Sequence, residues 1–459
     1  MTWASAGRRG HIAQLILLCS VLAGMLVTLS GCELFRAEPR TEAPVALGKE
    51  PEVRVRVVPG ASTLTFGGAS RVVLRPISGG VASTVPAPVT IEMTPQGLRA
   101  KPAGAAPITW PFGTDIEVIP QASWTSGSSS ASSSRAGGTP ASTTVTINGV
   151  MYPGLAQVRG RWNASAADEA TLDAVCVMPI ESYLPGVLSK ELIKGWPRQS
   201  YEAQAIAARS YALHERRRAR SLGKAWDLEN DTSDQVFGGI TSDRTSMEAA
   251  RATRGRVLVD SAGELVRAYF SSTCGGRPAS APDAFGTPAG QEFNRAAPLQ
   301  ARARPHACQT ASLYRWTIDR SDTDLSRRLR TWGQFNGHEV RSLSLVRAVE
   351  PARSNTAGRP IDYRVTDDRG RTFTLRGEQL RQAINQSVEG LPNVTRATRA
   401  NSGDVDVSFS GGRATIQGRG FGHGVGLCQW CARGFALEGR DASQILALMY
   451  PGSTVRQRY

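Results

Sequence analysis

Two helices separated by a short break are predicted between residues 178 and 211. In the first, Leu184, Val187 and Leu188 recur at helical spacing and therefore share one apolar face. Glu191 continues the same face one turn later, and Ser182 is a candidate cap for the start of the helix. The segment GWP at 195–197 should end this helix, because proline and glycine interrupt helices. A carboxylate is thus expected in line with an apolar stripe.

Such a position has two interpretations. Removal of water around Glu191 would raise the pKa of its carboxyl and keep it protonated, as a general acid requires. Alternatively, Glu191 lies at the end of the helix and turns back to solvent. The second helix, predicted to begin near Ser200, has a face of small residues, flanked by Gln204 and Arg209. Each of these two side chains either reaches a cleft or is a solvated helix residue.

The rest of the pattern alternates between short strands and helices. Residues 53–58 alternate apolar and polar, as a half-buried strand does, and similar short strands are expected at 63–66, 71–74 and 89–93. A strand pair is predicted at 257–259 and 265–270, and helices are predicted at 246–254, 323–329 and 377–384. We therefore expect an α+β fold with helices and antiparallel strands around a cleft, preceded by a small β region at 51–120.

The N-terminal residues predict where the protein is located. Residues 1–31 have an arginine pair followed by a long uncharged apolar run, which is typical of a secretory signal. The run ends in LSGC and is similar to a bacterial lipobox, so Cys32 is expected to carry the lipid anchor. Residues 32–50 would then form a tether between the lipid and the folded part. In the alternative interpretation, the apolar run in residues 1–31 is not cleaved and remains as a membrane helix. We expect an exported protein, anchored by lipid to the cell envelope.

Residues 121–145 are rich in serine and glycine and predict a disordered loop. The main domain is then expected at 146–459. Within it, an acidic loop at 227–239 contains Gln235, which either contacts a ligand or belongs to an ordinary turn.

Two glycine-containing segments are candidates for an active-site loop. In SSTCGG at 271–276, Ser272 and Thr273 offer hydroxyl groups, although the segment is equally consistent with a tight turn. In GRGFGHGVGLCQW at 418–430, alternating glycines surround His423 and permit close backbone approach, and Gln429 follows on a predicted helix. His423 alone would usually be structural, but in this loop it is a candidate for contacting substrate or for orienting Glu191, and Gln429 is a candidate second polar contact.

Four of the cysteines leave several possibilities open. Cys176 lies in an apolar strand and is expected to be a buried free thiol. For the other four cysteines we favour disulfides, which an exported compartment permits. The CxxC spacing also suits a zinc site of four thiolates, and free thiols are a third possibility. The four residues are Cys274, Cys308, Cys428 and Cys431.

Four segments in this order resemble one family. They are YLPGVLSKEL, YEAQAIAARSYAL, AYFSSTCGG and GRGFGHGVGLCQW, and the resemblance covers roughly residue 147 to the C-terminus. They are similar to the core of the sporulation stage II protein D family, which includes LytB-type amidase enhancers. The resemblance implies that 146–459 is a catalytic domain, that Glu191 is the catalytic acid, and that peptidoglycan glycan strands are the substrate.

The resemblance also implies a lytic transglycosylase reaction that leaves 1,6-anhydro-muramyl ends and needs no cofactor. Some members carry zinc near the STCGG-like motif, but Ser271 and Ser272 stand here where a histidine ligand would be expected. The alternatives are a non-catalytic enhancer with a murein amidase as partner, or a glycan-binding lipoprotein. The net charge of +15 fits an acidic polymer such as peptidoglycan, and no nucleic-acid motif is present.

Overall fold

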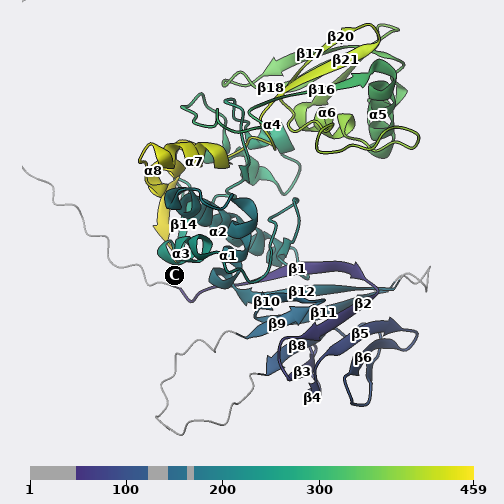
Figure 1. Ribbon diagram of the computed structural model, residues 1–459, viewed down its shortest axis with the longest axis vertical. Coiled ribbons are helices and arrows are strands. Elements are labelled where there is room, and N and C mark those ends of the chain that lie inside the picture. Colours follow the sequence, from purple (N-terminus) through teal and green to yellow (C-terminus); the bar gives the residue numbers. More distant parts are fainter. Residues whose placement is uncertain (1–47, 122–142, 163–169) are drawn as a thin grey trace, which may run out of the picture. The chain divides into compact units, whose positions relative to one another are not determined.

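The computed structural model describes residues 48–121, 143–162 and 170–459. The predicted signal segment, Cys32, most of the predicted tether and nearly all of the Ser/Gly-rich segment lie outside the described residues. Helices and mostly antiparallel strands in several sheets form a mixed architecture (Figure 1), which confirms the predicted α+β class. Among the described helices, none combines the length and the apolar character that crossing a membrane requires.

Two large sheets share one hydrophobic core. In spatial order, the seven-stranded sheet consists of β13 (Leu228–Glu229), β1 (Glu52–Ala61), β12 (Thr171–Pro179), β11 (Leu155–Arg161), β8 (Ile116–Gln121), β3 (Arg71–Pro76) and β4 (Ser83–Pro86). The six-stranded sheet consists of β10 (Val150–Pro153), β9 (Thr144–Ile147), β2 (Thr63–Gly67), β5 (Val89–Thr94), β6 (Gly97–Pro102) and β7 (Ile108–Trp110). Strands from before and after the Ser/Gly-rich segment therefore belong to the same two sheets.

The strand β1 shows how the sequence pattern becomes a buried face. Its residues Val53, Val55 and Val57 point into the core, while the residues between them are only partly covered. It pairs antiparallel with β12, from Glu52 opposite Pro179 to Ala61 opposite Leu172. Because β12 leads directly into the first helix, this pairing places the start of that helix.

A group of helices follows this sheet. They are α1 (Ile180–Glu191), α2 (Arg198–Ser221), α3 (Arg244–Ala252), α7 (Gln429–Leu437) and α8 (Ala442–Met449). The prediction that Ser182 caps α1 is wrong, because the helix begins two residues earlier, after Pro179, and has no side-chain cap. Instead, the Ile180 N–H donates to the Pro51 carbonyl and the Glu181 N–H donates to the Glu50 carboxylate. The segment before β1 thus satisfies the helix N-terminus.

Two short strand pairs connect this part of the chain. Strand β14 (Arg256–Val259) pairs with β23 (Thr454–Gln457), and β15 (Phe270–Ser271) pairs in parallel with β22 (Leu427–Cys428). The predicted strand at 265–270 is mostly wrong. Within this segment, only Leu265 forms an isolated β-bridge and only Phe270 belongs to a strand. The Tyr269 N–H donates instead to the Arg267 carbonyl, which turns the chain just before that strand. A short helix, α4 (Ala281–Phe285), and 3-10 turns at Glu292–Arg295 and Ala297–Leu299 follow.

Residues 315–419 form a second hydrophobic cluster with its own sheets. One sheet has the order β16 (Arg315–Ser321), β21 (Arg413–Arg419), β20 (Val405–Ser410), and the other has the order β17 (Val346–Ser354), β18 (Pro360–Asp367), β19 (Thr372–Arg376). The helices α5 (Asp322–Phe335) and α6 (Gly377–Ile384) and a 3-10 turn at Glu339–Ser342 complete it. The predicted helix at 377–384 is confirmed, and the one at 323–329 is confirmed but longer.

Candidate functional site

Glu191 is the last residue of α1. The apolar face of this helix is fully buried at Leu184, Val187 and Leu188, as the spacing predicts. The helix ends because Leu192 adopts an extended conformation while its N–H still bonds the Leu188 carbonyl at 3.0 Å. The buried stripe therefore brings the Glu191 side chain up to the edge of the core.

The carboxyl of Glu191 is held by two donors from distant parts of the chain. The side-chain amide Nε2 of Gln429 donates to its Oε2 at 3.1 Å, and the backbone N–H of Val236 is a second donor. Burial raises the pKa of Glu191 above its usual value, while these two hydrogen bonds oppose the rise. A carboxyl with a raised pKa is suited to donate a proton near neutral pH.

Gln429 owes its position to the glycine-rich segment that precedes it. It is the first residue of α7, directly after β22. The β15–β22 pairing aligns Ser271 with Cys428, and the Trp430 N–H donates to the Ser272 carbonyl at 3.1 Å. The structure thus joins three segments of the predicted site at the end of α1: the helix with Glu191, the SSTCGG segment and the start of α7.

Two tryptophans and one arginine lie beside this junction. Trp196, from the break between α1 and α2, packs edge-to-face against Trp430 with ring centroids 5.1 Å apart. The guanidinium of Arg433 lies 5.4 Å from the Trp430 ring and 6.0 Å from the Trp196 ring. Both rings are only partly buried. Half-exposed rings next to a cation suit a ligand with apolar faces and negative charge.

The structure places His423 in different surroundings from those predicted. Its ring contacts Tyr269 and Phe285, and its Nδ1 accepts from the Val425 N–H at 3.0 Å. Burial lowers the pKa of His423 to about 4, although the nearby Glu378 carboxylate opposes this shift, so the imidazole is neutral at pH 7. Among the described residues, no hydrogen bond connects His423 with Glu191.

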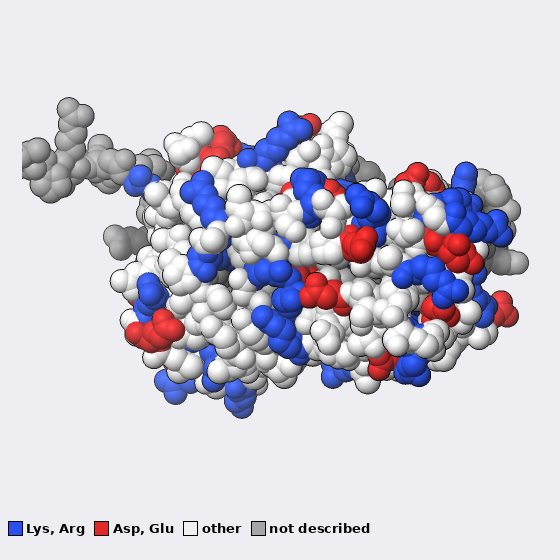
Figure 2. Space-filling view, turned by 90° about the horizontal axis from the view of Figure 1, so that it is seen from above, with Lys and Arg blue, Asp and Glu red and all other residues white. Residues whose placement is uncertain are grey.

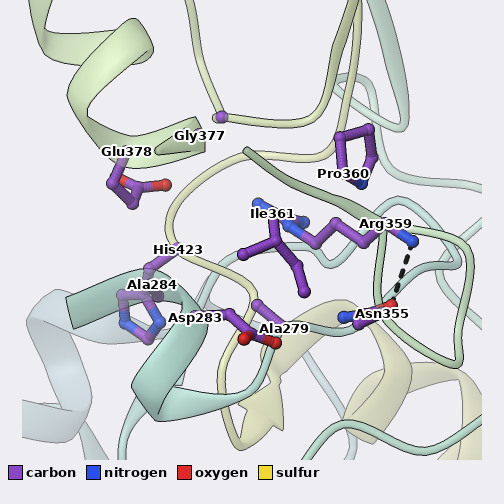
Figure 3. Close-up of a pocket in the computed structure, with 11 residues that line it drawn as sticks. Ala279, Asp283, Ala284, Asn355, Arg359, Pro360, Ile361, Gly377, Glu378 and His423 are labelled. Atoms are coloured by element: carbon purple, nitrogen blue, oxygen red, sulfur yellow. Dashed lines mark hydrogen bonds between the residues drawn. The ribbon is translucent and has the colours of Figure 1, made fainter. Parts of the chain in front are cut away.

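His423 lines a small pocket with charged neighbours (Figure 3). Asp283 and Ala284 of α4 lie on one side of it, Glu378 at the start of α6 lies on another, and Arg359 extends its guanidinium toward the centre. The space open to the centre of a water molecule is about 10 Å³, which is room for about one water and not for a sugar ring.

Ser272 and Thr273 lie in the loop that meets the glycine-rich segment. Thr273 is buried, and its backbone exchanges hydrogen bonds with that of Phe421 in both directions. Its hydroxyl accepts from the Gly275 N–H at 3.4 Å. Ser272 is half-buried, and its carbonyl accepts from the start of α7. Of the two predicted hydroxyl donors, Ser272 is therefore the more accessible.

The polar groups of Arg209 and Gln235 form hydrogen bonds with other groups inside the protein. Arg209 is fully buried and forms a two-point pair with Glu181, with Nε to Oε1 at 2.9 Å and Nη2 to Oε2 at 2.8 Å. The remaining donors of Arg209 bond to backbone carbonyls and Thr253. Gln235 accepts from the Tyr183 hydroxyl and donates to the Ala208 carbonyl. Both were predicted as substrate contacts, and this geometry favours structural roles.

Gln204 differs from these two residues. It lies on α2 and is fully buried, yet neither atom of its side-chain amide has a hydrogen-bond partner among the described residues. A buried amide without partners is costly, so such a group needs an explanation. The role of Gln204 as a substrate contact stays a prediction.

The four cysteines of the loop segments come together. Their Sγ atoms all lie within 4.8 Å of one another, every one of the four is buried, and none forms a disulfide. Cys176 lies apart in β12 as a buried free thiol, as predicted. The set contains Cys274, Cys308, Cys428 and Cys431.

The sequence patterns missed the Trp196, Trp430 and Arg433 group. The available signal was the spacing of Trp430 and Arg433, which lie three positions apart and therefore on one face of the helix after the glycine-rich segment. Trp196 offered only its place in the helix break, and no local pattern indicates that it meets a residue more than two hundred positions away.

Comparison with known proteins supports this assignment of motifs. Residues 168–259, which include α1, α2 and Glu191, match the family described as stage II sporulation protein. Residues 288–426 match a family described as a domain of unknown function. The second match covers the whole 315–419 cluster and ends before Gln429.

Three relatives are similar over longer stretches. An uncharacterised protein of Brachyspira hyodysenteriae is 29% identical over 309 residues, which is 67% of this chain and 73% of that protein. The amidase enhancer of Bacillus subtilis is 24% identical over 59% of this chain but only 40% of its own length. Stage II sporulation protein D of Bacillus subtilis is 24% identical over 61% of this chain and 75% of its own length. Residues 168–259 therefore belong to the stage II sporulation protein family, and the chain is similar over longer stretches to stage II sporulation protein D and the amidase enhancer.

Proposed function

We propose that this protein is a lytic transglycosylase that cleaves the glycan strands of peptidoglycan, with Glu191 as its single acid and base. The observation that carries the proposal is the Glu191 carboxyl itself, which has a pKa raised by burial and accepts a hydrogen bond from Gln429. Family membership supports a role connected with the cell wall.

In the first step, protonated Glu191 donates its proton to the oxygen of the β-1,4 bond after N-acetylmuramic acid. The bond between C1 and that oxygen breaks, and the departing sugar leaves with a free hydroxyl. The Glu191 carboxylate then removes the proton from the muramyl 6-hydroxyl, and that oxygen forms a bond to C1. The products are two shorter strands, one of which has a 1,6-anhydro end. No water is consumed, and Glu191 regains its proton.

One carboxyl suffices for this reaction, whereas hydrolysis of a glycoside normally uses two. The two glutamates that flank Glu191 in the sequence of the catalytic helices have other partners. Glu181 is paired with Arg209, and although burial opposes it, the hydrogen bonds from Arg209, Tyr459 and Gly255 lower its pKa. Glu202 accepts from Arg198 at 2.7 Å. Neither arrangement offers a free general base, which favours the transglycosylase route.

The surroundings of Glu191 suit an acidic glycan. The partly exposed rings of Trp196 and Trp430 can stack on sugar rings, and Arg433 can pair with the carboxylates that peptidoglycan carries on its lactyl groups and stem peptides. Figure 2 shows Lys and Arg side chains spread across one face of the molecule and interrupted by acidic ones, so the positive charge of that face is not gathered in one block.

The signal-like sequence at 1–31 and Cys32 support an exported protein that is anchored to the cell envelope by lipid. Zinc is not needed for the proton transfers described above. Under the main proposal the protein binds the glycan strand, and its lipid anchor attaches it to the membrane.

The second candidate function is enhancement of a murein amidase without catalysis, which the name of one relative favours. The deciding experiment incubates purified sacculi with the protein and with the variant Glu191→Gln, followed by mass spectrometry of the released fragments. We expect anhydro ends from the wild type and about 10²–10⁴-fold fewer from the variant. Equal release by both proteins would exclude Glu191 as the acid. Binding of sacculi with no release, together with stimulation of an added amidase by both proteins, would establish the enhancer function instead.

A further inference from the structure

Four buried thiols meet where three separate segments of the chain converge. Cys274 follows β15, Cys308 lies in the loop before β16, and Cys428 and Cys431 lie at the start of α7. The Sγ atoms of Cys274 and Cys308 are 3.9 Å apart, those of Cys274 and Cys431 are 4.0 Å apart, and all four lie within 4.8 Å of one another.

These separations correspond to metal coordination. A tetrahedral zinc site with four bonds of about 2.3 Å to sulfur separates its sulfur atoms by about 3.8 Å. A disulfide would bring two sulfur atoms to about 2.05 Å and would divide the group into two pairs. Here one sulfur, that of Cys274, is near 4 Å from two others at once, so no division into pairs is apparent.

The backbone around the group also favours thiolates. The Cys428 Sγ accepts from the Cys274 N–H at 3.3 Å and from the Cys431 N–H at 3.4 Å. Two N–H donors stabilise negative charge on that sulfur, and they orient it as neighbouring groups orient metal ligands in general. Cys428 and Cys431 are separated by two residues across the first turn of α7, which is the usual spacing for a pair of zinc ligands.

We propose that Cys274, Cys308, Cys428 and Cys431 bind one thiophilic divalent cation of the zinc class as a closed structural site. Four protein ligands leave no open position, so the ion would have no part in the proton transfers of Glu191. Binding releases the thiol protons to solvent and replaces them with four metal–sulfur bonds. Three of the four ligands lie outside both matched family ranges, so neither match implies the site.

The site would fix the residue that holds the catalytic carboxyl. Gln429 lies between Cys428 and Cys431, and its amide donates to Glu191. A cation bound to both cysteines would anchor the first turn of α7 to the loops of Cys274 and Cys308. Gln429 would then be positioned by a cross-link among three segments rather than by one helix turn. This role depends on the proposed function, whereas the binding of the metal does not.

The test measures metal directly and needs no activity assay. The full protein is purified with zinc supplied, its metal content is measured by elemental mass spectrometry, and its thiols are counted under denaturing conditions by intact mass. We expect about one zinc per chain and no disulfide. After removal of zinc, titration with cobalt should give the absorption bands of tetrahedral cobalt–thiolate coordination, saturating at one equivalent.

Two variants complete the test. Cys308→Ser should lose the metal and the cobalt bands, whereas Cys176→Ala, which removes a buried thiol elsewhere, should keep both. Less than a tenth of an equivalent of zinc, with a mass lower by four hydrogens, would replace the proposal with two disulfides. Zinc-free protein with free thiols, or full metal content in Cys308→Ser, would also overturn it. Failure of the wild type to release anhydro ends, with one zinc bound, would refute the proposed function alone.

Discussion

Gln429 donates a hydrogen bond of 3.1 Å from its amide to the Glu191 carboxylate, across 238 positions of the sequence. The contact joins the end of α1 to the start of α7, and each residue occupies a helix terminus. Burial raises the pKa of Glu191, while this hydrogen bond favours the ionised form that exists between the two proposed proton transfers. The pair therefore balances the acid and base forms of one group.

Replacement of Gln429 by methionine should disturb that balance. Without the amide donor, the ionised form of Glu191 loses support and its pKa rises further. Since the first step needs the protonated form, the alkaline limb of the kcat/KM profile should move to higher pH, while the maximal rate falls about tenfold with loss of a hydrogen bond to a charged group. The exposed Gln334→Met on α5 is the control. An unchanged profile in Gln429→Met would show that the contact does not tune the acid.

Glu191→Gln should make the protein more stable at neutral pH. Because the pKa of Glu191 is raised in the folded state, folded and unfolded forms are both protonated below the unfolded pKa, and no penalty exists there. As pH rises through the unfolded pKa toward the folded one, the unfolded chain ionises first and stability is lost. The gain in Tm for Glu191→Gln should therefore be larger at pH 7 than at pH 4.

The matched control for this pH dependence is Glu248→Gln. Glu248 is exposed and pairs with Arg244 on the surface of α3. Removal of its charge should change Tm little at either pH, and any change should be a loss at neutral pH. A Tm difference for Glu191→Gln that does not vary with pH would mean that the carboxyl is not desolvated in the folded state.

Arg209 and Glu181 should matter for stability and not for substrate affinity. Arg209 is completely buried and holds Glu181 at two points, so Arg209→Met leaves a largely buried carboxylate without its cation. We expect a loss of about 3–5 kcal/mol in the free energy of unfolding, measured with denaturant. Arg244→Met, which breaks the exposed pair with Glu248, should cost about 1 kcal/mol or less. A raised KM with unchanged stability in Arg209→Met would restore it as a substrate contact.

Trp196 should contribute to glycan binding. Its ring is half-exposed beside Trp430 and within reach of the Arg433 guanidinium. Truncation of a tryptophan at a binding surface commonly costs more than about 1.4 kcal/mol, which is tenfold in affinity. Trp196→Ala should therefore weaken co-sedimentation with sacculi about tenfold. Trp162→Ala, which removes an exposed ring packed at a tilt against Phe112, should leave binding unchanged. Equal loss in both variants would point to general destabilisation.

Local periodicity predicts the helices and strands of this protein better than it predicts which distant residues contact them. The stripe through Leu188 correctly indicates that Glu191 borders the core, and the helix at 377–384 follows its apolar spacing. The start of α1 could not be predicted, because the groups that satisfy it lie in the segment before β1. The motif around Gln429 predicts a substrate contact, whereas its hydrogen bond to Glu191 depends on the β15–β22 pairing and could not be predicted.

Charged and polar residues show the same limit more sharply. Arg209 flanks a helix face of small residues in the sequence, which is consistent with a cleft residue. Only the packing of α3 and β14 reveals that carbonyls from those elements occupy its donors. Likewise, the spacing of the four cysteines allows three pairings or a metal site, and only their mutual distances in the fold distinguish among these geometries.

Gln204 offers a test that separates a structural amide from a functional one. Its amide is fully buried on α2 and has no hydrogen-bond partner among the described residues, which commonly costs about 1–3 kcal/mol. Gln204→Met keeps the side-chain length and removes both polar atoms, so we expect the free energy of unfolding to rise by about 1 kcal/mol. Ala205→Ser, which adds a hydroxyl at the neighbouring buried position, should lower it. If Gln204→Met instead loses stability, the amide holds a buried water, and if only KM rises, it contacts the substrate.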